Sequence, residues 1–532
     1  MGAPRPRKSR QDLPVPPWIA LILAVPLGAL TIVGFEPVGL SPAPIITLAF
    51  LFQRWAFAST PREAFCSGYG FGLGFFLAGV SWIYVSLHTF GAMPMPIAAL
   101  ATLLFCAFLA LFPAAGGYLV ARSQRSIVVK LALVAPAVWM LIEWIRGWIF
   151  TGFPWLTVGY SQTPGSPLAG YAAPLGVFGL SLVLALTAGG LALIISHSNN
   201  RIKPGESESA ALRRLVSSRE SRPVLGVVAA IALLWLGGAL LNKIEWTQPT
   251  GTSTTVALLQ GNVEQDMKWR PETLVATLDG YRNMVTASKA QLIVLPETAL
   301  PLFLHQVPPD YLDDLAAHAR KNQGDILIGV PERQPNGEYF NSVISLGISN
   351  GAQPQRYRKN HLVPFGEFIP LRPLLGWIVS VLAIPLQDFS RGAVDQQPLD
   401  VANQRVAVNI CYEDVFGEEI IRQLPQATML INASNVAWFG DSLAPQQHLQ
   451  ISQMRAMETG RYMLRATNTG MTAVIDQRGK VVESAPAFTR VTVTRAVPGY
   501  QGTTPFIRWG NYAALLIAAG MLTLALCLPR KA

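Results

Sequence analysis

The sequence predicts a helical membrane domain that carries an α/β domain with central sheets. Three observations support this fold class. Only 14% of the 532 residues are charged, against about 25% in a typical soluble domain. Long uncharged apolar stretches fill the first 240 residues and recur at the C-terminal end. Between these regions, short β-rich runs alternate with helical patterns and Pro/Gly turns, which is typical of an α/β domain. The apolar content also excludes a disordered or collagen-like chain.

Eight apolar stretches are the predicted transmembrane helices. Most approach the ~20 residues that cross a bilayer core. The second is short and carries Arg54 near one end, which makes it the weakest of the eight. No small-residue cleavage pattern follows the first, so we expect a retained helix rather than a signal peptide. The predicted spans are Trp18–Gly34, Pro42–Phe57, Ala64–Ser86, Met93–Val120, Ile127–Ile145, Leu175–Ile195, Pro223–Leu241 and Asn511–Leu528.

Lys and Arg gather in alternate loops between these spans. They cluster before the first span, before the third, at 122–130, at 201–222 and after the last. Because positive residues stay on the cytoplasmic side, both termini are expected there and the long segment between spans seven and eight outside. That segment, 243–508, holds 23 Lys and Arg against 24 Asp and Glu. The excess positive charge behind the net charge of +10 therefore lies outside this segment, in the loops and termini predicted to be cytoplasmic. It indicates membrane topology, and we expect no nucleic-acid partner.

We expect three segments along the chain. Residues 1–242 form the membrane domain with seven helices, residues 243–508 form the extracytoplasmic domain, and residues 509–532 form a last span with a short cytoplasmic tail. Alternating strands and helices predict central sheets in the middle segment. The predicted strands include Thr254–Leu259, Leu292–Leu295, Ile326–Val330, Val343–Leu346, Val406–Ile410 and Met429–Ile431. The predicted helices are Pro271–Ala290, Asp310–Asn322 and Pro445–Gly460.

Cys411 is the only thiol of the extracytoplasmic segment. It has no disulfide partner there, and the chain has no CxxC motif or Cys/His cluster, so we predict no metal site. Cys411 directly follows the apolar run Val406–Ile410. A strand that ends in a tight turn exposes a nucleophile and directs backbone N–H groups at an oxyanion. An inert buried thiol is the alternative interpretation.

A thiol nucleophile needs a base and a group that stabilises the oxyanion. Glu297 follows the apolar run Leu292–Leu295 and Pro296, at the kind of strand end where α/β sites gather. Lys359 lies in a loop rich in Pro, Gly and aromatic residues, and a fixed Lys would favour the thiolate. Glu367 and Glu413 could orient this Lys or balance its charge. For each of these residues, an ordinary surface role is the alternative.

Three motifs occur in order along the chain. They are LPET with Glu297, YRKNHLVPFGE with Lys359 and NICYED with Cys411. Together they resemble the Glu-Lys-Cys triad of the nitrilase superfamily, whose members fold as an α-β-β-α sandwich. With the membrane spans, the chain resembles the membrane-bound branch of that superfamily that N-acylates lipoproteins. Further similar stretches are Gly152–Leu156 with Gly159–Ser161, Leu259–Asn262 with Lys268–Trp269, and Asn432–Asn435 with Trp438–Phe439.

This resemblance implies an acyl transfer in two half-reactions at a bacterial inner membrane, with the catalytic domain on the periplasmic side. Glu297 would deprotonate Cys411, whose thiolate attacks a phospholipid ester, with phosphatidylethanolamine the expected donor. Lys359 would stabilise the oxyanion. The α-amine of a diacylated lipoprotein would then attack the thioester. The resemblance implies no cofactor, and we expect a monomer.

Aromatic residues are the candidates for substrate binding. Trp269, Tyr412 and Trp438 could form apolar walls that exclude water from the thioester, or they could be core residues. Trp155 and Tyr160 could line a lipid entry or anchor a loop at the membrane interface. Two other functions stay open at this stage. A membrane-tethered amidase of the same superfamily would act on small amides, and a scaffold or transporter would not need Cys411.

Overall fold

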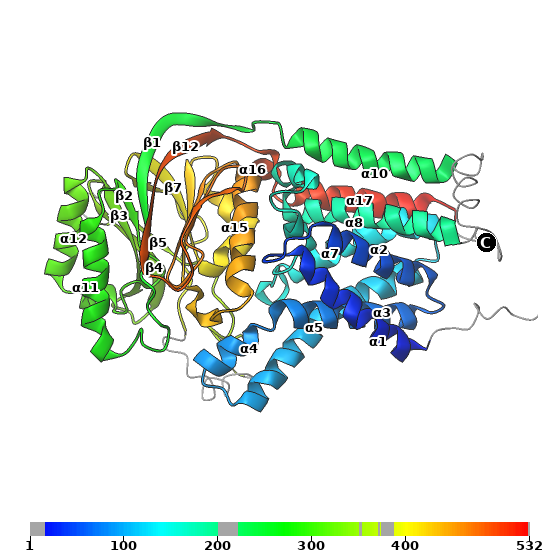
Figure 1. Cartoon of the computed structure of the whole chain (residues 1–532), viewed down its shortest axis with the longest axis horizontal. Helices are drawn as coiled ribbons and strands as arrows, with labels where there is room; N and C mark the ends of the chain where they lie inside the picture. The colour runs from blue at the N-terminus through cyan, green and yellow to red at the C-terminus, as the bar shows by residue number, and fades with distance from the viewer. Residues whose placement is uncertain (1–15, 200–221, 350–353, 371–372, 374–387, 530–532) are drawn as a thin grey trace, which may run out of the picture.

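The computed structural model describes residues 16–199, 222–349, 354–370, 373 and 388–529. A helical part and an α/β part lie side by side along the long axis of the molecule (Figure 1). The helical part combines the N-terminal half of the chain with the last helix. The basic N-terminal segment and most of the basic segment at 201–222 lie outside the described residues, so the predicted topology stays a prediction.

The helical part consists of apolar helices whose hydrophobic side chains extend around the whole circumference. Such helices are stable in lipid or deep in a core. In α10, only 6% of the most apolar window is buried within the protein, which indicates a surface that faces lipid. The helices are α1 (Pro17–Thr31), α2 (Pro42–Phe57), α3 (Pro61–Val80), α4 (Ile83–Val85), α5 (Met95–Arg122), α6 (Ile127–Val129), α7 (Ala135–Arg146), α8 (Ala172–Asn199), α10 (Arg222–Leu241) and α17 (Tyr512–Cys527).

Five helices of the described residues are long and apolar enough to cross a membrane. A sixth candidate span is obtained if α3 and the helix at Ile83–Phe90 are counted together, although the chain bends by 55° between them. The predicted span Ala64–Ser86 is thus broken near its end. The helices α2 and α17, which correspond to two further predicted spans, have only 16 residues each. Five or six spans are therefore supported, and a total of eight stays a prediction.

Glycines on α1 and α3 bring the helices of the membrane part close together. A Cβ atom on Gly74 would lie 1.9 Å from the carbonyl oxygen of Val25, and one on Gly70 would lie 2.1 Å from that of Leu21. Lipid supplies little hydrophobic drive for helix association, so close backbone packing through small residues takes its place. The glycines of α3 therefore fix its position against α1.

Two six-stranded sheets form the α/β part, with the strand orders β12-β1-β2-β3-β4-β5 and β11-β10-β9-β8-β7-β6. The pairs β1–β2, β2–β3, β7–β8 and β8–β9 are parallel. The strands are β1 (Thr247–Gln260), β2 (Leu292–Val294), β3 (Asp325–Arg333), β4 (Tyr339–Gly347), β5 (Arg356–Arg358), β6 (Leu399–Val401), β7 (Gln404–Ile410), β8 (Met429–Ser434), β9 (Met463–Thr467), β10 (Ala473–Ile475), β11 (Val481–Ser484) and β12 (Val491–Gly502). All six predicted strands are present, although β1 begins at Thr247, seven residues before the predicted start.

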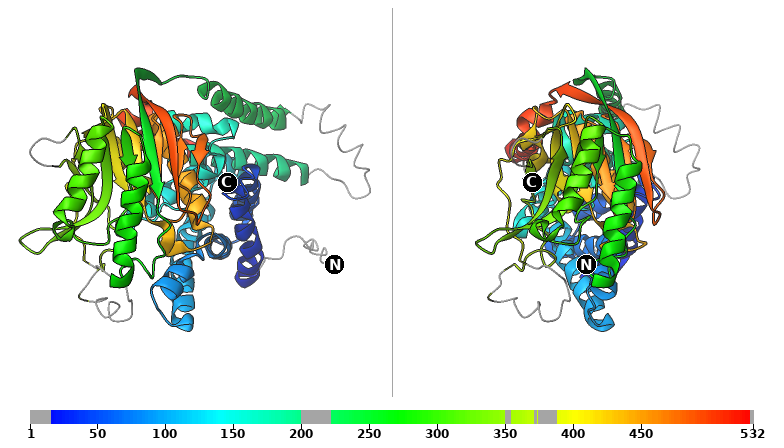
Figure 2. Two further views of the ribbon diagram at one scale, coloured as in Figure 1. Left: turned by 60° about the vertical axis from the view of Figure 1, so that its left-hand side comes forward. Right: turned by 90° about the vertical axis from the view of Figure 1, so that its left-hand side faces the viewer.

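The sheets face each other and have helices on their outer faces (Figures 1 and 2). Alternation along β1 shows the arrangement, because successive strand residues point to opposite faces. Val256 and Leu258 pack between the sheets, whereas Ala257 and Leu259 pack against α11 (Pro271–Ala287) and α12 (Pro309–Lys321). The helix α15 (Ala444–Thr459) covers the second sheet. The layers are thus α-β-β-α, as the resemblance implied.

The α/β part is joined to the helical part at both of its ends. The first strand, β1, follows α10, and the last strand, β12, leads through α16 (Pro505–Trp509) into α17. These two strands pair antiparallel over most of their length, from Thr247 opposite Gly502 to Gln260 opposite Val491. The two connections to the membrane helices therefore lie next to each other (Figure 1).

The helix α15 lies between the second sheet and the membrane helices (Figure 1). Every residue of α15 except Gln446 is buried, although the helix is rich in Gln and contains Arg455 and Glu458. Some of its polar groups bond directly to the helical part. The Gln447 Oε1 accepts from the Trp155 Nε1 at 2.7 Å, and the Glu458 Oε1 accepts from the Val177 N–H at 2.8 Å. A polar helix is therefore buried because two neighbours satisfy its hydrogen bonds.

Candidate active site

Cys411 lies in a strained turn at the end of β7. Its φ angle is +52°, a left-handed conformation that costs a residue with a side chain about 1–3 kcal/mol. A short 3-10 turn, Cys411–Val415, follows directly. The Cys411 carbonyl oxygen accepts from the Asn432 Nδ2 of β8 at 3.0 Å. The predicted strand-to-turn elbow is present, and the thiol is only partly buried.

Glu297 lies just beyond the C-terminal end of β2, as the sequence predicts, and is 7% exposed. Its carboxylate is held on both sides. The Oε1 atom accepts from the Asn341 Nδ2 at 2.7 Å, and the Oε2 atom accepts from the Asn435 main-chain N–H at 2.8 Å. Both donors come from strands or strand ends of the two sheets, so the carboxylate is fixed between them.

Lys359 follows β5 and is 1% exposed. Its Nζ atom lies 3.5 Å from the Glu297 Oε1 and 2.8 Å from the Glu367 Oε2. Glu367 is thus the nearer carboxylate, and it also accepts from the Asn341 Nδ2 at 3.0 Å. The predicted partnership of Lys359 with Glu367 is present. The structure therefore brings Glu297, Lys359 and Glu367 together as one buried charge cluster.

The charges of this cluster act on the thiol. Burial and the nearby Glu297 carboxylate raise the pKa of Cys411 to about 12, although the Lys359 ammonium opposes this effect. Burial alone would lower the pKa of Lys359, but the Glu367 and Glu297 carboxylates hold it above its ordinary value. At neutral pH the thiol is therefore neutral and the Lys359 ammonium is charged, and the Glu297 carboxyl group interacts electrostatically with both.

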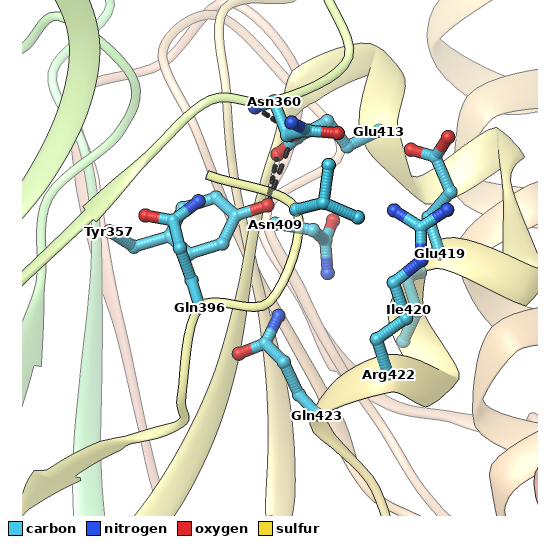
Figure 3. A pocket seen from close by; sticks show the side chains of 10 residues that line it. Tyr357, Asn360, Gln396, Asn409, Glu413, Glu419, Ile420, Arg422 and Gln423 are labelled. Atoms are coloured by element: carbon cyan, nitrogen blue, oxygen red, sulfur yellow. Dashed lines mark hydrogen bonds between the residues drawn. The ribbon is translucent and has the colours of Figure 1, made fainter. Parts of the chain in front are cut away.

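Glu413 contacts the main chain next to Lys359 rather than the Lys359 ammonium. Its Oε1 atom accepts from the N–H groups of Asn360 at 2.7 Å and His361 at 3.0 Å. Its Oε2 atom accepts from the Ile410 N–H at 2.7 Å, and the Tyr357 hydroxyl donates to both oxygens. Figure 3 shows Glu413, Tyr357 and Asn360 around one small pocket. Glu413 thus ties the Lys359 loop to the turn that holds Cys411.

The aromatic candidates fall into two groups. Tyr412, Trp155 and Tyr160 are buried where the α/β part meets the helical part. The Tyr412 hydroxyl donates to the Gly152 carbonyl oxygen at 3.0 Å. Trp269 and Trp438 are only partly buried. The main-chain carbonyl of Trp438 accepts from the Ser86 hydroxyl at 2.7 Å.

A buried polar network supports the turn after Cys411, and sequence reasoning missed it. Asp414, three residues after the thiol, lies 2.6 Å from the His448 Nε2 and 3.3 Å from the Arg465 Nη1. Arg465 also contacts the His448 Nδ1 at 2.8 Å and the Asn432 Oδ1 at 2.9 Å. Because Arg only donates, the His448 Nδ1 must accept and its Nε2–H donates to Asp414. His448 is therefore a neutral ring, and burial and Arg465 lower its pKa.

Comparisons with known proteins cover nearly the whole chain. The sequence profile of the apolipoprotein N-acyltransferase N-terminal domain matches residues 27–190, and that of the carbon-nitrogen hydrolases matches residues 255–504. The chain is 52% identical over 510 residues to a protein named apolipoprotein N-acyltransferase from Nitrosomonas europaea, covering 96% of this chain and 97% of that one. A protein of the same name from Methylococcus capsulatus is 44% identical over 515 residues, with 96% of each chain covered.

Proposed function

Because the chain belongs to the family of the apolipoprotein N-acyltransferases, we propose that it transfers an acyl chain from a membrane phospholipid to the α-amine of a diacylglyceryl-cysteine lipoprotein. The observation that carries this proposal is the position of the Cys411 turn. The Cys411 thiol interacts electrostatically with Glu297 and Lys359 of the charge cluster, in a chain whose other half consists of apolar helices. A thiol nucleophile near a membrane suits a lipid ester as acyl donor.

In the first half-reaction, Glu297 takes the proton from the Cys411 Sγ, and the thiolate attacks the ester carbonyl of the phospholipid. Lys359 and main-chain N–H groups near Cys411 stabilise the oxyanion. The C–O bond then breaks, and Glu297 returns the proton to the departing lysophospholipid oxygen. A thioester on Cys411 remains. We expect phosphatidylethanolamine to be the donor.

In the second half-reaction, the lipoprotein α-amine attacks the thioester. Glu297 takes a proton from the amine and passes it to the Cys411 Sγ as the C–S bond breaks. The products are an amide and the restored thiol, so the kinetics should be of the ping-pong type. Water competes with the amine at the thioester, and we propose that the rings of Trp269 and Trp438 limit its access.

The membrane helices suit this reaction because both substrates are anchored in a bilayer. Attachment of the α/β part at both ends holds the thiol near the membrane surface, which raises the effective concentration of lipid. We propose that residues 243–508 form the catalytic domain on the periplasmic side of the inner membrane, with both termini cytoplasmic. We also propose that the protein works as a monomer without a cofactor.

Mass spectrometry of the Cys411 peptide tests the proposal. After incubation with phosphatidylethanolamine alone, we expect an acyl adduct on Cys411 that disappears when a diacylated lipopeptide is added. The Cys411→Ala variant should lose N-acylation and still insert into the membrane. Rapid turnover of small soluble amides without any acyl adduct would instead favour a membrane-tethered amidase and overturn the proposal.

A further inference from the structure

Lys268 is a second buried lysine beside the charge cluster of Glu297, Lys359 and Glu367. It lies in the loop between β1 and α11 and is 3% exposed. Its Nζ atom donates to the main-chain carbonyl oxygen of Glu297 at 3.3 Å. Among the described residues, no carboxylate oxygen lies within 4.0 Å of this ammonium. An ammonium has three N–H donors, so the one hydrogen bond to Glu297 leaves most of its donor capacity unused.

The loop that carries Lys268 is fixed by polar contacts on its N-terminal side. The Asn435 Nδ2 donates to the Gln265 Oε1 at 2.7 Å, and the Asn468 Nδ2 donates to the Val263 carbonyl oxygen at 2.7 Å. Asn435 is also the residue whose main-chain N–H holds the Glu297 Oε2. The same segment therefore positions the Glu297 carboxylate and the loop that brings Lys268 to it.

The charge balance of the site needs a second cation. The carboxyl groups of Glu297 and Glu367 are both buried, and among the described residues the Lys359 ammonium is the only cation within 4.0 Å of either. An uncompensated buried charge is costly. Lys268 interacts electrostatically with both Glu297 and Cys411, so its charge compensates the pair whichever of the two groups carries the proton.

We propose that Lys268 is a positioning residue of this site, whose positive charge keeps the Cys411–Glu297 pair neutralised while the proton moves from the thiol to the carboxylate. The proton leaves the Cys411 Sγ and binds a Glu297 oxygen, so the net charge of the site does not change and only its location shifts. This inference rests on the proposed function. It assigns to Lys268 a role beyond holding the Glu297 main chain.

The titration of Lys268 supplies a second signature. Burial lowers the pKa of Lys268 to about 8, against the opposing effect of the Glu297 and Cys411 charges. As the pH rises above 8, the lysine becomes neutral and its effect on the thiol is lost. An arginine at this position keeps its charge throughout that range.

Two substitutions separate charge from hydrogen bonding. Lys268→Gln keeps a donor for the Glu297 carbonyl but removes the charge, whereas Lys268→Arg keeps the charge. Lys289→Gln makes the same change at an exposed position and is the matched control. The readouts are the rate of Cys411 alkylation by iodoacetamide, followed by mass spectrometry, and the kcat and KM of lipopeptide N-acylation. Thermal unfolding in detergent checks that each variant is folded.

We expect Lys268→Gln to slow alkylation at pH 7 and to lower kcat by at least tenfold, with KM within twofold of the unsubstituted protein. For Lys268→Arg, the alkylation rate and kcat should both lie within threefold of the values for the unsubstituted protein. Above pH 8, Lys268→Arg should still be alkylated faster than Lys268→Gln, whereas the unsubstituted protein should no longer be. The inference would be overturned if Lys268→Gln had the same alkylation rate and kcat as the unsubstituted protein. It would also be overturned if Lys268→Gln and Lys268→Arg lowered these rates equally. If no variant forms an acyl adduct, the proposed function fails, but the alkylation rates still test the charge of Lys268.

Discussion

Replacing Glu413 by Gln should uncouple the Lys359 loop from the Cys411 turn. The Glu413 carboxylate accepts three main-chain N–H groups, at 2.7 Å from Asn360, 3.0 Å from His361 and 2.7 Å from Ile410. An amide has only one acceptor oxygen, so its NH2 group must face at least one of these donors. The least damaging orientation leaves the Ile410 N–H without an acceptor.

The cost of Glu413→Gln follows from these contacts. A buried N–H without a partner costs about 1–3 kcal/mol. Burial raises the pKa of Glu413 to about 7, so above pH 7 loss of the charge also weakens the two remaining hydrogen bonds by about 1 kcal/mol each. We therefore expect the free energy of unfolding to fall by about 3–5 kcal/mol. The lost bond holds Ile410, the residue before Cys411, and the two weakened bonds hold the residues after Lys359. A displacement of about 1 Å can cost about 100-fold in rate. We expect kcat to fall by about that factor.

Glu419→Gln is the matched control for this prediction. Glu419 lines the same small pocket (Figure 3) but contacts only the His361 ring, at 3.1 Å, among the contacts described, and its side chain is 23% exposed. Its substitution should change stability by less than about 1 kcal/mol. Thermal unfolding in detergent and lipopeptide N-acylation measure both effects. The assignment of Glu413 as the link between the Lys359 loop and the Cys411 turn is refuted if Glu413→Gln changes the free energy of unfolding by less than about 1 kcal/mol and kcat by less than twofold.

Three further substitutions test other parts of the structure. Tyr412→Phe removes a buried hydrogen bond to the helical part and should lower stability by about 1–2 kcal/mol in thermal unfolding, with a several-fold loss of kcat; an unchanged melting temperature would contradict this. A Lys in place of Arg465 cannot reach all four of its buried partners, Asp414, Asn432, Ser452 and His448. Arg465→Lys should lower stability by about 2–4 kcal/mol, which denaturant titration measures against the intact protein. Gly74→Ala places a Cβ 1.9 Å from a main-chain oxygen and should reduce the yield of folded protein in membranes, whereas Gly520→Ala, with open space around it, should not.

The sequence was sufficient to predict the elements that position the site. Glu297 and Cys411 each follow a short apolar run, and runs of that length between turn residues are typical of buried parallel strands. Because α/β sites gather at the carboxyl ends of parallel strands, each pattern places its residue at such an end. The two ends meet only because the sheets that contain β2 and β7 face each other. Local pattern thus contains the information for Glu297 and Cys411, and the Lys359 loop was recognisable from its mixture of Pro, Gly and aromatic residues.

The sequence was not sufficient to predict the environment of polar residues that become buried. In α15, Gln447, His448, Arg455 and Glu458 have no apolar periodicity that would indicate burial. Their burial depends on a second partner, the helical part, which covers the face that a two-layer domain would leave in water. Lys268 was missed for the same reason, because a lysine in a polar loop gives no local sign of losing its solvent. The break between α3 and the helix at Ile83–Phe90 was also invisible, because both halves are apolar.

The strained turn at Cys411 is held in place by contacts from both parts of the molecule. A left-handed residue with a side chain persists only where surrounding contacts fix it. Asn432 holds the Cys411 carbonyl, and Arg465 with His448 holds Asp414 from within the α/β part. The third contact, from the Tyr412 hydroxyl to the Gly152 carbonyl, comes from the helical part. The helical part therefore does more than anchor the α/β part, because its Gly152 loop helps to fix the backbone conformation of the proposed nucleophile.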